Sequence, residues 1–254
     1  MNMGKIALIP ARAGSKRLLS KNITPLNGHP LIAYTIAATL ASQQFAAVVV
    51  STDSDEIAAI ARYYGAEVPF MRPAELAADL SPDYDWIRYT LDGLSERGRE
   101  YDCFSILRPT SPFRQADTIV RAMKQFSGKK EFDSLRAVEL CKQHPGKMWK
   151  IEGDRMFPLL SGGPINPPWH SSAYQALPPV YVQNASLEIA WVRVIYETGT
   201  IAGNVIMPFL TEGCEGVDIN SPNDLIIVDN LIRTKAAQLP VIGQKPYGTQ
   251  GEKR

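Results

Sequence analysis

Short apolar, β-branched runs alternate along the first half of the chain with longer segments whose apolar residues recur at helical spacing. Strands that are separated by helices of about 10–15 residues are typical of βαβ crossovers, so this alternation predicts an α/β fold with a mostly parallel sheet. The predicted strands are Lys5–Pro10, Ala47–Ser51, Glu67–Met71, Cys103–Leu107 and Ser134–Val138. The predicted helices are Pro30–Gln44, Asp53–Tyr64, Asp83–Arg97 and Ala116–Ser127.

The alternation breaks down after the fifth predicted strand and returns near residue 180. Residues 141–179 are crowded with proline and glycine, so we expect a loop-rich excursion that serves as a lid or a dimerisation arm. Apolar runs follow at Val180–Val192 and Val205–Phe209, and a last helix is predicted over Ser221–Leu239. We therefore expect one Rossmann-like domain over residues 1–239 and a flexible tail over residues 240–254.

Composition and charge mainly exclude classes of protein. The chain has 27 Lys and Arg against 26 Asp and Glu, whereas binders of nucleic acid or of anionic membranes usually carry a larger basic excess. The three cysteines are widely spaced, which favours reduced thiols over a disulfide framework or a zinc site. The N-terminal apolar run is too short for a signal peptide or a membrane span. We expect a cytoplasmic protein that binds neither nucleic acid nor membranes.

The loop after the first predicted strand is the strongest candidate site. It reads Pro10-Ala11-Arg12-Ala13-Gly14-Ser15-Lys16-Arg17 and is followed by Lys21 and Asn22. Small residues let backbone N–H groups approach a phosphate closely, and Arg and Lys supply cations. The loop is not a Walker A sequence, because no glycine stands five residues before Gly14. These residues alone fit either a phosphate-binding loop or a solvated basic turn.

Five segments, in this order, resemble the signature of the CMP-sugar synthetases, the acylneuraminate cytidylyltransferase family. They are PARxGSKxxxxKN from Pro10 to Asn22, RPxxLAxD from Arg72 to Asp79, RPTSPFR from Arg108 to Arg114, LP at Leu177 followed by Asn184, and VDINxxxDL from Val217 to Leu225. The resemblance implies a nucleotidyltransferase domain that transfers CMP from CTP to the anomeric hydroxyl of a nonulosonic acid, a 2-keto-3-deoxy sugar acid, and releases pyrophosphate. It also implies Mg²⁺ as cofactor and a homodimer.

The same resemblance implies roles for individual residues. Arg12 and Lys21 would hold the triphosphate, and Asp218 with Asn220 would hold Mg²⁺; Arg12, Lys21 and Asp218 are the expected catalytic residues. The expected nucleotide-binding residues are Ala11, Arg12, Ala13, Gly14, Ser15, Lys21, Asn22, Arg72 and Ser81. The expected sugar-binding residues are Arg108, Thr110, Ser111, Lys142, Asn184 and Glu188.

Three positions depart from the family pattern. Asn220 stands where the family commonly has a second Asp, which predicts a weaker metal site, because an amide oxygen adds no charge. Arg108 stands where Gln is common, and Glu188 lies in the segment that resembles NGAIY. Arg108 could bind the acceptor carboxylate or form an ion pair with Glu188. We expect an acceptor other than common sialic acid, such as a legionaminic- or pseudaminic-type sugar.

Several candidate residues also suit structural roles. Ser81 precedes Pro82 as an N-cap would, Asp53 and Glu56 have the spacing of a capping box, and Asp224 lies in the first turn of the last predicted helix. For the whole chain, the alternatives are activation of another sugar or ulosonate, with CTP or another nucleotide, and a catalytically silent nucleotide-binding scaffold.

Overall fold

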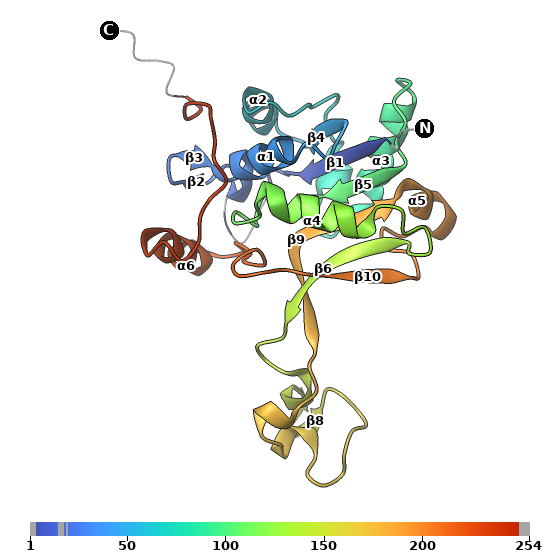
Figure 1. Ribbon diagram of the computed structural model, residues 1–254, viewed down its shortest axis with the longest axis vertical. Helices are drawn as coiled ribbons and strands as arrows, with labels where there is room; N and C mark the ends of the chain where they lie inside the picture. Colours follow the sequence, from blue (N-terminus) through green and yellow to red (C-terminus); the bar gives the residue numbers. More distant parts are fainter. Residues whose placement is uncertain (1–3, 15–17, 19, 249–254) are drawn as a thin grey trace. The chain divides into compact units, whose positions relative to one another are not determined.

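A computed structural model describes residues 4–14, 18 and 20–248, and in this part of the chain a six-stranded sheet forms the core (Figure 1). β1 pairs in parallel with β4 and β5, whereas β5 pairs antiparallel with β9. The predicted α/β fold with a mostly parallel sheet is confirmed. In the order β10-β6-β9-β5-β1-β4, the strands are Ile206–Leu210, Ser134–Leu140, Tyr181–Trp191, Cys103–Ile106, Lys5–Pro10 and Ala47–Ser51.

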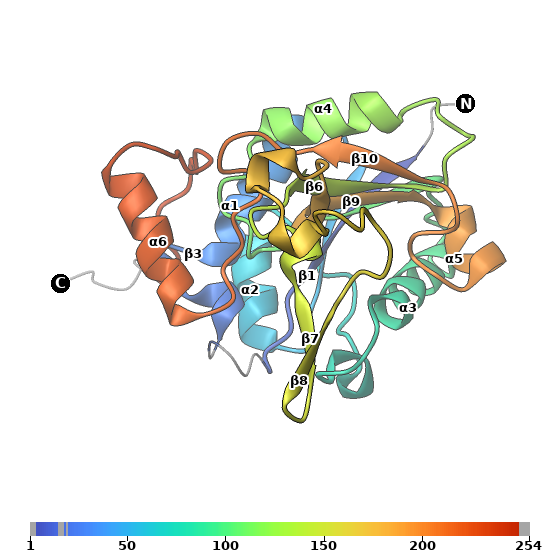
Figure 2. The same cartoon turned by 90° about the horizontal axis from the view of Figure 1, so that it is seen from below.

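Helices cover both faces of this sheet (Figure 2). Successive strand residues point to opposite faces, and β1 is buried on both of them. Ala7 and Ile9 pack in the cluster that contains α1, α2 and α4, whereas Ile6 and Leu8 pack in the cluster that contains α3 and α5. From α1 to α6 the helices are Leu31–Ser42, Asp55–Tyr63, Asp83–Ser95, Ala116–Phe126, Val192–Thr198 and Pro222–Arg233.

The predicted strand Glu67–Met71 is wrong. Glu67 alone bridges to β4, donating its N–H to the Val48 carbonyl at 2.8 Å and accepting from the Val50 N–H at 2.9 Å. Pro69 has no N–H to donate, so the ladder cannot continue. The chain meets the end of β4 again where the Arg72 N–H donates to the Thr52 carbonyl at 2.7 Å, which places Arg72 at the carboxyl end of the sheet.

Two predicted helix caps are wrong. The N-cap of α2 is Ser54, whose hydroxyl accepts from the Ile57 N–H at 3.3 Å, so Asp53 does not cap this helix. The N-cap of α3 is Pro82, and the Ser81 hydroxyl instead donates to the Glu75 carbonyl at 2.8 Å. Both side chains are therefore engaged in loops, outside the helices that they precede.

The cap predicted for the last helix is confirmed. Ser221 and Asp224 form a reciprocal capping box at the start of α6. This helix ends at Arg233 instead of Leu239, because Lys235 adopts a left-handed conformation with φ of 59°. Among the described residues, no helix is long and apolar enough to cross a membrane.

The chain divides into two compact units, Met1–Ala137 with Asn184–Arg254, and Val138–Gln183. The larger unit also contains the short pair β2 (Pro25–Leu26) and β3 (His29–Pro30), and the smaller unit contains the hairpin of β7 (Trp149–Glu152) and β8 (Arg155–Pro158).

Hydrogen bonds from two side chains hold the loops of the smaller unit. His144 accepts from the Gly146 N–H through Nδ1, so its Nε2 donates to the Pro178 carbonyl, at 2.9 Å in each case. The Lys147 ammonium donates to the carbonyls of His170 at 3.2 Å and Ser172 at 2.8 Å.

Candidate active site

The carboxyl ends of three strands meet at one edge of the sheet. Pro10 of β1 lies beside Ser51 of β4, and Leu8 lies beside Ile106 of β5. Open α/β sheets bind ligands beyond this edge, and a cavity of about 490 Å³ opens there. Its lining includes Arg12, Lys21, Asn22, Arg72, Asp79, Ser81, Asp83, Trp86, Arg108, Thr110, Ala185, Asp218 and Asn220.

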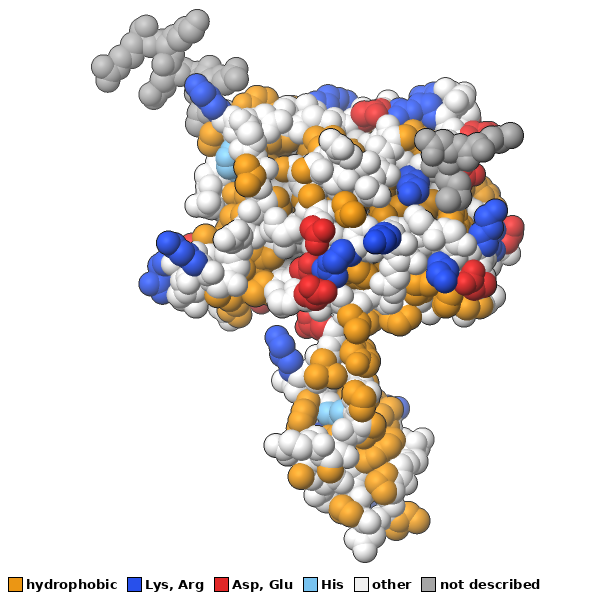
Figure 3. Space-filling model, in the orientation of Figure 1, with side chains coloured by type: hydrophobic (Ala, Val, Ile, Leu, Met, Phe, Trp, Pro, Cys, Tyr) orange, Lys and Arg blue, Asp and Glu red, His pale blue; other side chains and the backbone are white. Residues whose placement is uncertain are grey.

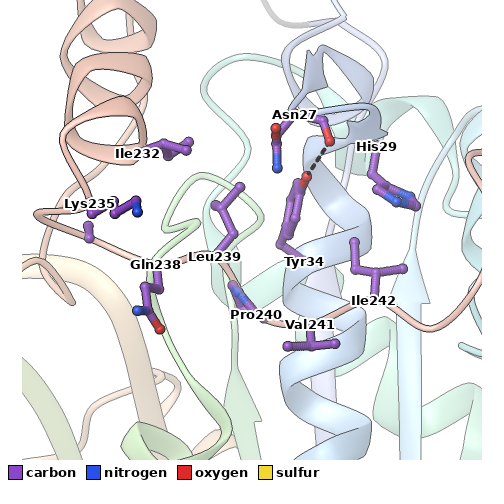
Figure 4. A pocket seen from close by; sticks show the side chains of 11 residues that line it. Asn27, His29, Tyr34, Ile232, Lys235, Gln238, Leu239, Pro240, Val241 and Ile242 are labelled. Carbon is purple, nitrogen blue, oxygen red and sulfur yellow. Dashed lines mark hydrogen bonds between the residues drawn. The ribbon is translucent and has the colours of Figure 1, made fainter.

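A second cavity, of about 470 Å³, lies between α1 and the segment that follows α6 (Figure 4). His29, Tyr34 and Lys235 line it together with apolar side chains from residues 237–242. Among the residues that the structure describes, its lining has one lysine, no arginine and none of the predicted site residues. A triphosphate needs several converging cations, so the cavity at the strand ends is the better candidate site.

The loop after β1 is held by hydrogen bonds to the end of β4 and to the residues that follow β4. The Ala11 N–H donates to the Ser51 carbonyl at 3.0 Å, and the Ala13 N–H donates to Asp53 Oδ1 at 2.8 Å. Asn22 donates through Nδ2 to the Arg12 carbonyl at 3.1 Å. Asp53 and Asn22 thus shape the predicted phosphate loop. Its residues Ser15, Lys16 and Arg17 lie outside the described residues.

Arg12 reaches the cavity but is held by the segment beside it. Its Nη1 lies 2.8 Å from Asp79 Oδ1 and donates to the Ala77 carbonyl at 3.1 Å. Each side chain of this pair is about one-third exposed, and such pairs contribute only about 0–1 kcal/mol. A triphosphate carries more negative charge than one carboxylate and would compete for Arg12 effectively.

Arg72 is a fixed cation in the wall of the cavity. It donates through Nε to Ser51 Oγ at 3.0 Å and through Nη2 to the Ser51 carbonyl at 2.8 Å. Its guanidinium lies over the Trp86 ring, 4.6 Å from the ring centroid. Burial lowers the pKa of Arg72 to about 10, so the side chain stays charged at neutral pH.

Asp218 is the carboxylate of this cavity that best fits a metal ion. The N–H of Ile219 donates to the Thr110 carbonyl at 2.9 Å and anchors the segment. Asp218 accepts a hydrogen bond from Asn220 through Oδ2, while its Oδ1 is buried and has no hydrogen-bond partner among the described residues. Because Mg²⁺ prefers carboxylate oxygens, Oδ1 is a suitable ligand atom.

Asn220 links Asp218 to Lys21. Its Oδ1 accepts from Lys21 Nζ at 3.2 Å while its Nδ2 donates to Asp218. Asp224 points to the helix cap: it accepts the Asn220 N–H at 2.8 Å, and this hydrogen bond above all holds the pKa of Asp224 below its usual range. No group of three His, Cys, Asp or Glu side chains gathers in the described part of the chain, so a bound Mg²⁺ would need oxygens from phosphates and water.

Four charged side chains form a chain that runs from the lining of the cavity into the protein, which we call the charge chain: Asp83, Arg108, Glu188 and Arg136. Arg108 Nη2 lies 2.5 Å from Asp83 Oδ2 and 2.9 Å from Glu188 Oε1, and Glu188 also pairs with Arg136. The ion pair of Arg108 with Glu188, one of the two alternatives for Arg108, is thus present. Burial would raise the pKa of Asp83, but the charge and hydrogen bond of Arg108 hold it below its usual value.

The other predicted sugar-binding residues take different positions. Thr110 lines the cavity, and the next residue in the sequence, Ser111, is buried. Asn184 donates to Thr211 Oγ1 at 2.9 Å and accepts from the Ser186 N–H, which are contacts within the larger unit. Lys142 belongs to the smaller unit.

Sequence reasoning missed four residues of this region. Asp83 and Trp86 are three residues apart on one face of α3, and Trp86 Nε1 donates to Asp83 Oδ1 at 2.7 Å. Arg114 is fully buried and donates to the carbonyls of Ser186 and Arg108, and burial lowers its pKa to about 9. The spacing of Asp83 and Trp86 was a usable signal, whereas nothing local marks Arg114 or Arg136 as buried.

Known proteins resemble this chain in sequence and in fold. A family model described as Cytidylyltransferase matches residues 6–139. The CMP-N,N'-diacetyllegionaminic acid synthase of Legionella pneumophila is 34% identical over 232 residues, which cover 89% of this chain and 95% of that protein. The N-acylneuraminate cytidylyltransferase of Escherichia coli is 41% identical over 133 residues, which cover 52% of this chain and 30% of that protein.

Among solved structures, a CMP:2-keto-3-deoxy-manno-octonic acid synthetase complexed with CTP matches with a TM-score of 0.65. The match covers 91% of this chain and 99% of that chain at 13% identity, so it supports the fold alone. The family model and the full-length relative confirm the resemblance found in the five sequence segments. The chain therefore belongs to the cytidylyltransferase family, among the CMP-nonulosonate synthetases.

Proposed function

We propose that the protein is a Mg²⁺-dependent cytidylyltransferase that transfers CMP from CTP to the anomeric hydroxyl of a nonulosonic acid. The observation that carries the proposal is the cavity at the carboxyl ends of the strands. Arg12, Lys21 and Arg72 line it, and Asp218 lines it with a buried carboxylate oxygen that has no hydrogen-bond partner among the described residues. This combination of cations and a carboxylate suits a metal-bound triphosphate.

The reaction needs positioning and charge stabilisation more than covalent chemistry. The anomeric oxygen attacks the α-phosphorus and its hydroxyl proton passes to solvent water; the bond from that phosphorus to the bridging oxygen breaks, and pyrophosphate departs. In this proposal Arg12, Lys21 and Arg72 hold the phosphate oxygens on which negative charge develops. Asp218 would hold Mg²⁺, which would supply further stabilisation of that charge.

The acceptor is proposed to be a legionaminic-type acid. The full-length relative from Legionella pneumophila is named for N,N'-diacetyllegionaminic acid, and this chain departs from the common sialic-acid pattern at Arg108 and Glu188. Arg108 lines the cavity and is the arginine of the charge chain that faces it. A carboxylate or acyl oxygen of the acceptor is a suitable partner for it.

Pyrophosphate release tests this function. The full chain is incubated with Mg²⁺ and CTP across a panel of nonulosonic acids, with GTP, UTP and ATP in parallel reactions. Release with CTP and N,N'-diacetyllegionaminic acid, but not with CTP alone, is expected. Turnover with another nucleotide would contradict the choice of CTP, and no turnover with any pair would leave only a nucleotide-binding scaffold.

We also propose that the protein forms a homodimer through the smaller unit. Large apolar side chains gather on the surface of this unit (Figure 3), and Ile151 and Ile165 are 78% and 94% exposed. All four residues of β7 and all four of β8 are exposed. Two-stranded hairpins are marginally stable in water, and apolar patches of this kind are typical of protein interfaces. We propose that a second copy of the chain buries these apolar side chains.

The homodimer predicts a specific response to a charge in the hairpin. Ile151→Lys with Phe157→Lys is expected to convert a dimer to a monomer in sedimentation equilibrium, because buried unpaired charges oppose association. Ile226→Lys, at an exposed position of α6, is the matched control and should stay dimeric. A monomeric unmutated protein at micromolar concentration would contradict the proposal.

A cytoplasmic location is proposed on the state of the thiols. Cys103, Cys141 and Cys214 are all unpaired. Burial raises the pKa of Cys103 to about 12, which keeps that thiol protonated and unreactive. Unpaired cysteines are typical of proteins that work in a reducing compartment.

A further inference from the structure

The charge chain fixes Arg108 in one orientation. Its Nη2 carries two hydrogens, and it has two carboxylate partners, Asp83 Oδ2 and Glu188 Oε1. Two bonds in different directions from one nitrogen set the plane of the guanidinium as well as its position. Arg108 is therefore held more firmly than a single surface ion pair would hold it.

This arrangement leaves a definite set of donors on Arg108. A guanidinium has five N–H groups, so Nη1 keeps two and Nε keeps one. Neither nitrogen has a hydrogen-bond partner in the described part of the chain, and Arg108 lines the cavity. Both two-nitrogen edges of the guanidinium include Nη2, which is occupied. Arg108 can thus contact an acceptor oxygen at single points, but it cannot clamp a carboxylate with two parallel bonds.

Glu188 and Arg136 support Arg108 from behind the cavity. Both side chains are largely buried, with exposed fractions of 7% and 11%, and neither lines the cavity. Glu188 pairs with the guanidiniums of Arg108 and Arg136, and Asp83 pairs with Arg108. The charge chain therefore contains two positive and two negative charges. Removing one member leaves an uncompensated charge in a poorly solvated place.

We infer that Glu188 and Arg136 are positioning residues that determine acceptor specificity through Arg108. They aim Nη1 and Nε of Arg108 at an oxygen of the sugar acid without touching the acceptor themselves. The inference rests on the proposed function, which it deepens. The alternative is a structural ion network that stabilises the unit without any effect on acceptor recognition.

A double-mutant cycle separates the two roles. Arg108→Gln, Glu188→Gln and the double variant are assayed for pyrophosphate release, with KM measured separately for N,N'-diacetyllegionaminic acid and for CTP. Gln at 188 turns an NH₂ group toward one of the two guanidiniums. Glu188→Gln is expected to raise KM for the acid about 10–100-fold, the loss of one charged hydrogen bond, and to leave KM for CTP within about threefold.

If Glu188 acts through Arg108, its replacement adds nothing once Arg108 is Gln. KM for the acid should then be the same in Arg108→Gln and in the double variant, within about twofold. Independent, multiplying effects would overturn the inference, and so would an equal rise in KM for CTP. If the Glu188→Gln variant does not fold, the double variant Glu188→Gln with Arg136→Gln is used in its place. It removes one charge of each sign, and the same changes in KM are expected.

The control is an arginine with the same chemistry outside the cavity. Arg121 lies between Glu212 at 3.1 Å and Glu215 at 2.5 Å, so Arg121→Gln breaks a comparable pair of contacts. Neither KM should change in this variant. Failure of the unmutated protein to use CTP with any acid would overturn the proposed function and the inference together, whereas additive effects in an active enzyme overturn the inference alone.

Discussion

Replacing Asp218 by asparagine is expected to raise the activation free energy of CMP transfer by about 4 kcal/mol, which lowers kcat roughly 10³-fold. The other carboxylates that line the cavity are engaged: Asp79 pairs with Arg12, and Asp83 pairs with Arg108. Asp218 Oδ1 is the buried carboxylate oxygen of the lining without a hydrogen-bond partner among the described residues. An amide at this position keeps the shape but removes the charge that would hold Mg²⁺.

The measurement is pyrophosphate release as a function of Mg²⁺ concentration, with the melting temperature as a check on folding. Asp229→Asn, on the exposed surface of α6, is the control and should behave like the unmutated protein. Asn220→Asp is the opposite change, since it adds a carboxylate beside Asp218, and it should lower the Mg²⁺ concentration for half-maximal rate. If Asp218→Asn turns over as fast as the unmutated protein at saturating Mg²⁺, the assignment of Asp218 as a Mg²⁺ ligand is refuted.

The sheet and its helices could be predicted because local patterns determine them. The continuous apolar run of β1 and the apolar spacing in the helices are properties of short windows of sequence. The failed strand at Glu67–Met71 contains Pro69, whose missing N–H was visible in the sequence. The choice of Ser54 over Asp53 as a cap depended on a tertiary contact, because the Ala13 N–H binds Asp53.

The candidate site was predictable where it follows the strand ends and less so where it depends on distant pairs. Parallel pairing of β1, β4 and β5 brings their following loops together, which the order of elements already implied. The contact of Arg108 with Glu188 joins residues far apart in sequence, and it was foreseen as one of two alternatives. Asp83 and Arg136 complete the charge chain, but no spacing links either of them to Glu188.

Lys21→Ala is expected to lower kcat/KM for CTP roughly 10²–10³-fold, because a cation in a desolvated site stabilises the charge that develops on the phosphates. Lys21 begins a short 3-10 turn and lines the cavity beside Asn220, a neutral partner.

The fold should tolerate this change. Lys21 donates a hydrogen bond to the uncharged amide of Asn220, and replacing residues of this partly exposed kind seldom changes the free energy of unfolding by more than about 0.5 kcal/mol. Lys124→Ala, at an exposed position of α4, removes the same charge away from the cavity and should keep full activity. If both variants melt at the temperature of the unmutated protein and only Lys21→Ala loses turnover, Lys21 is assigned to the triphosphate. Neither lost stability nor lost net charge could then explain the loss of turnover. Full turnover by Lys21→Ala would remove that assignment.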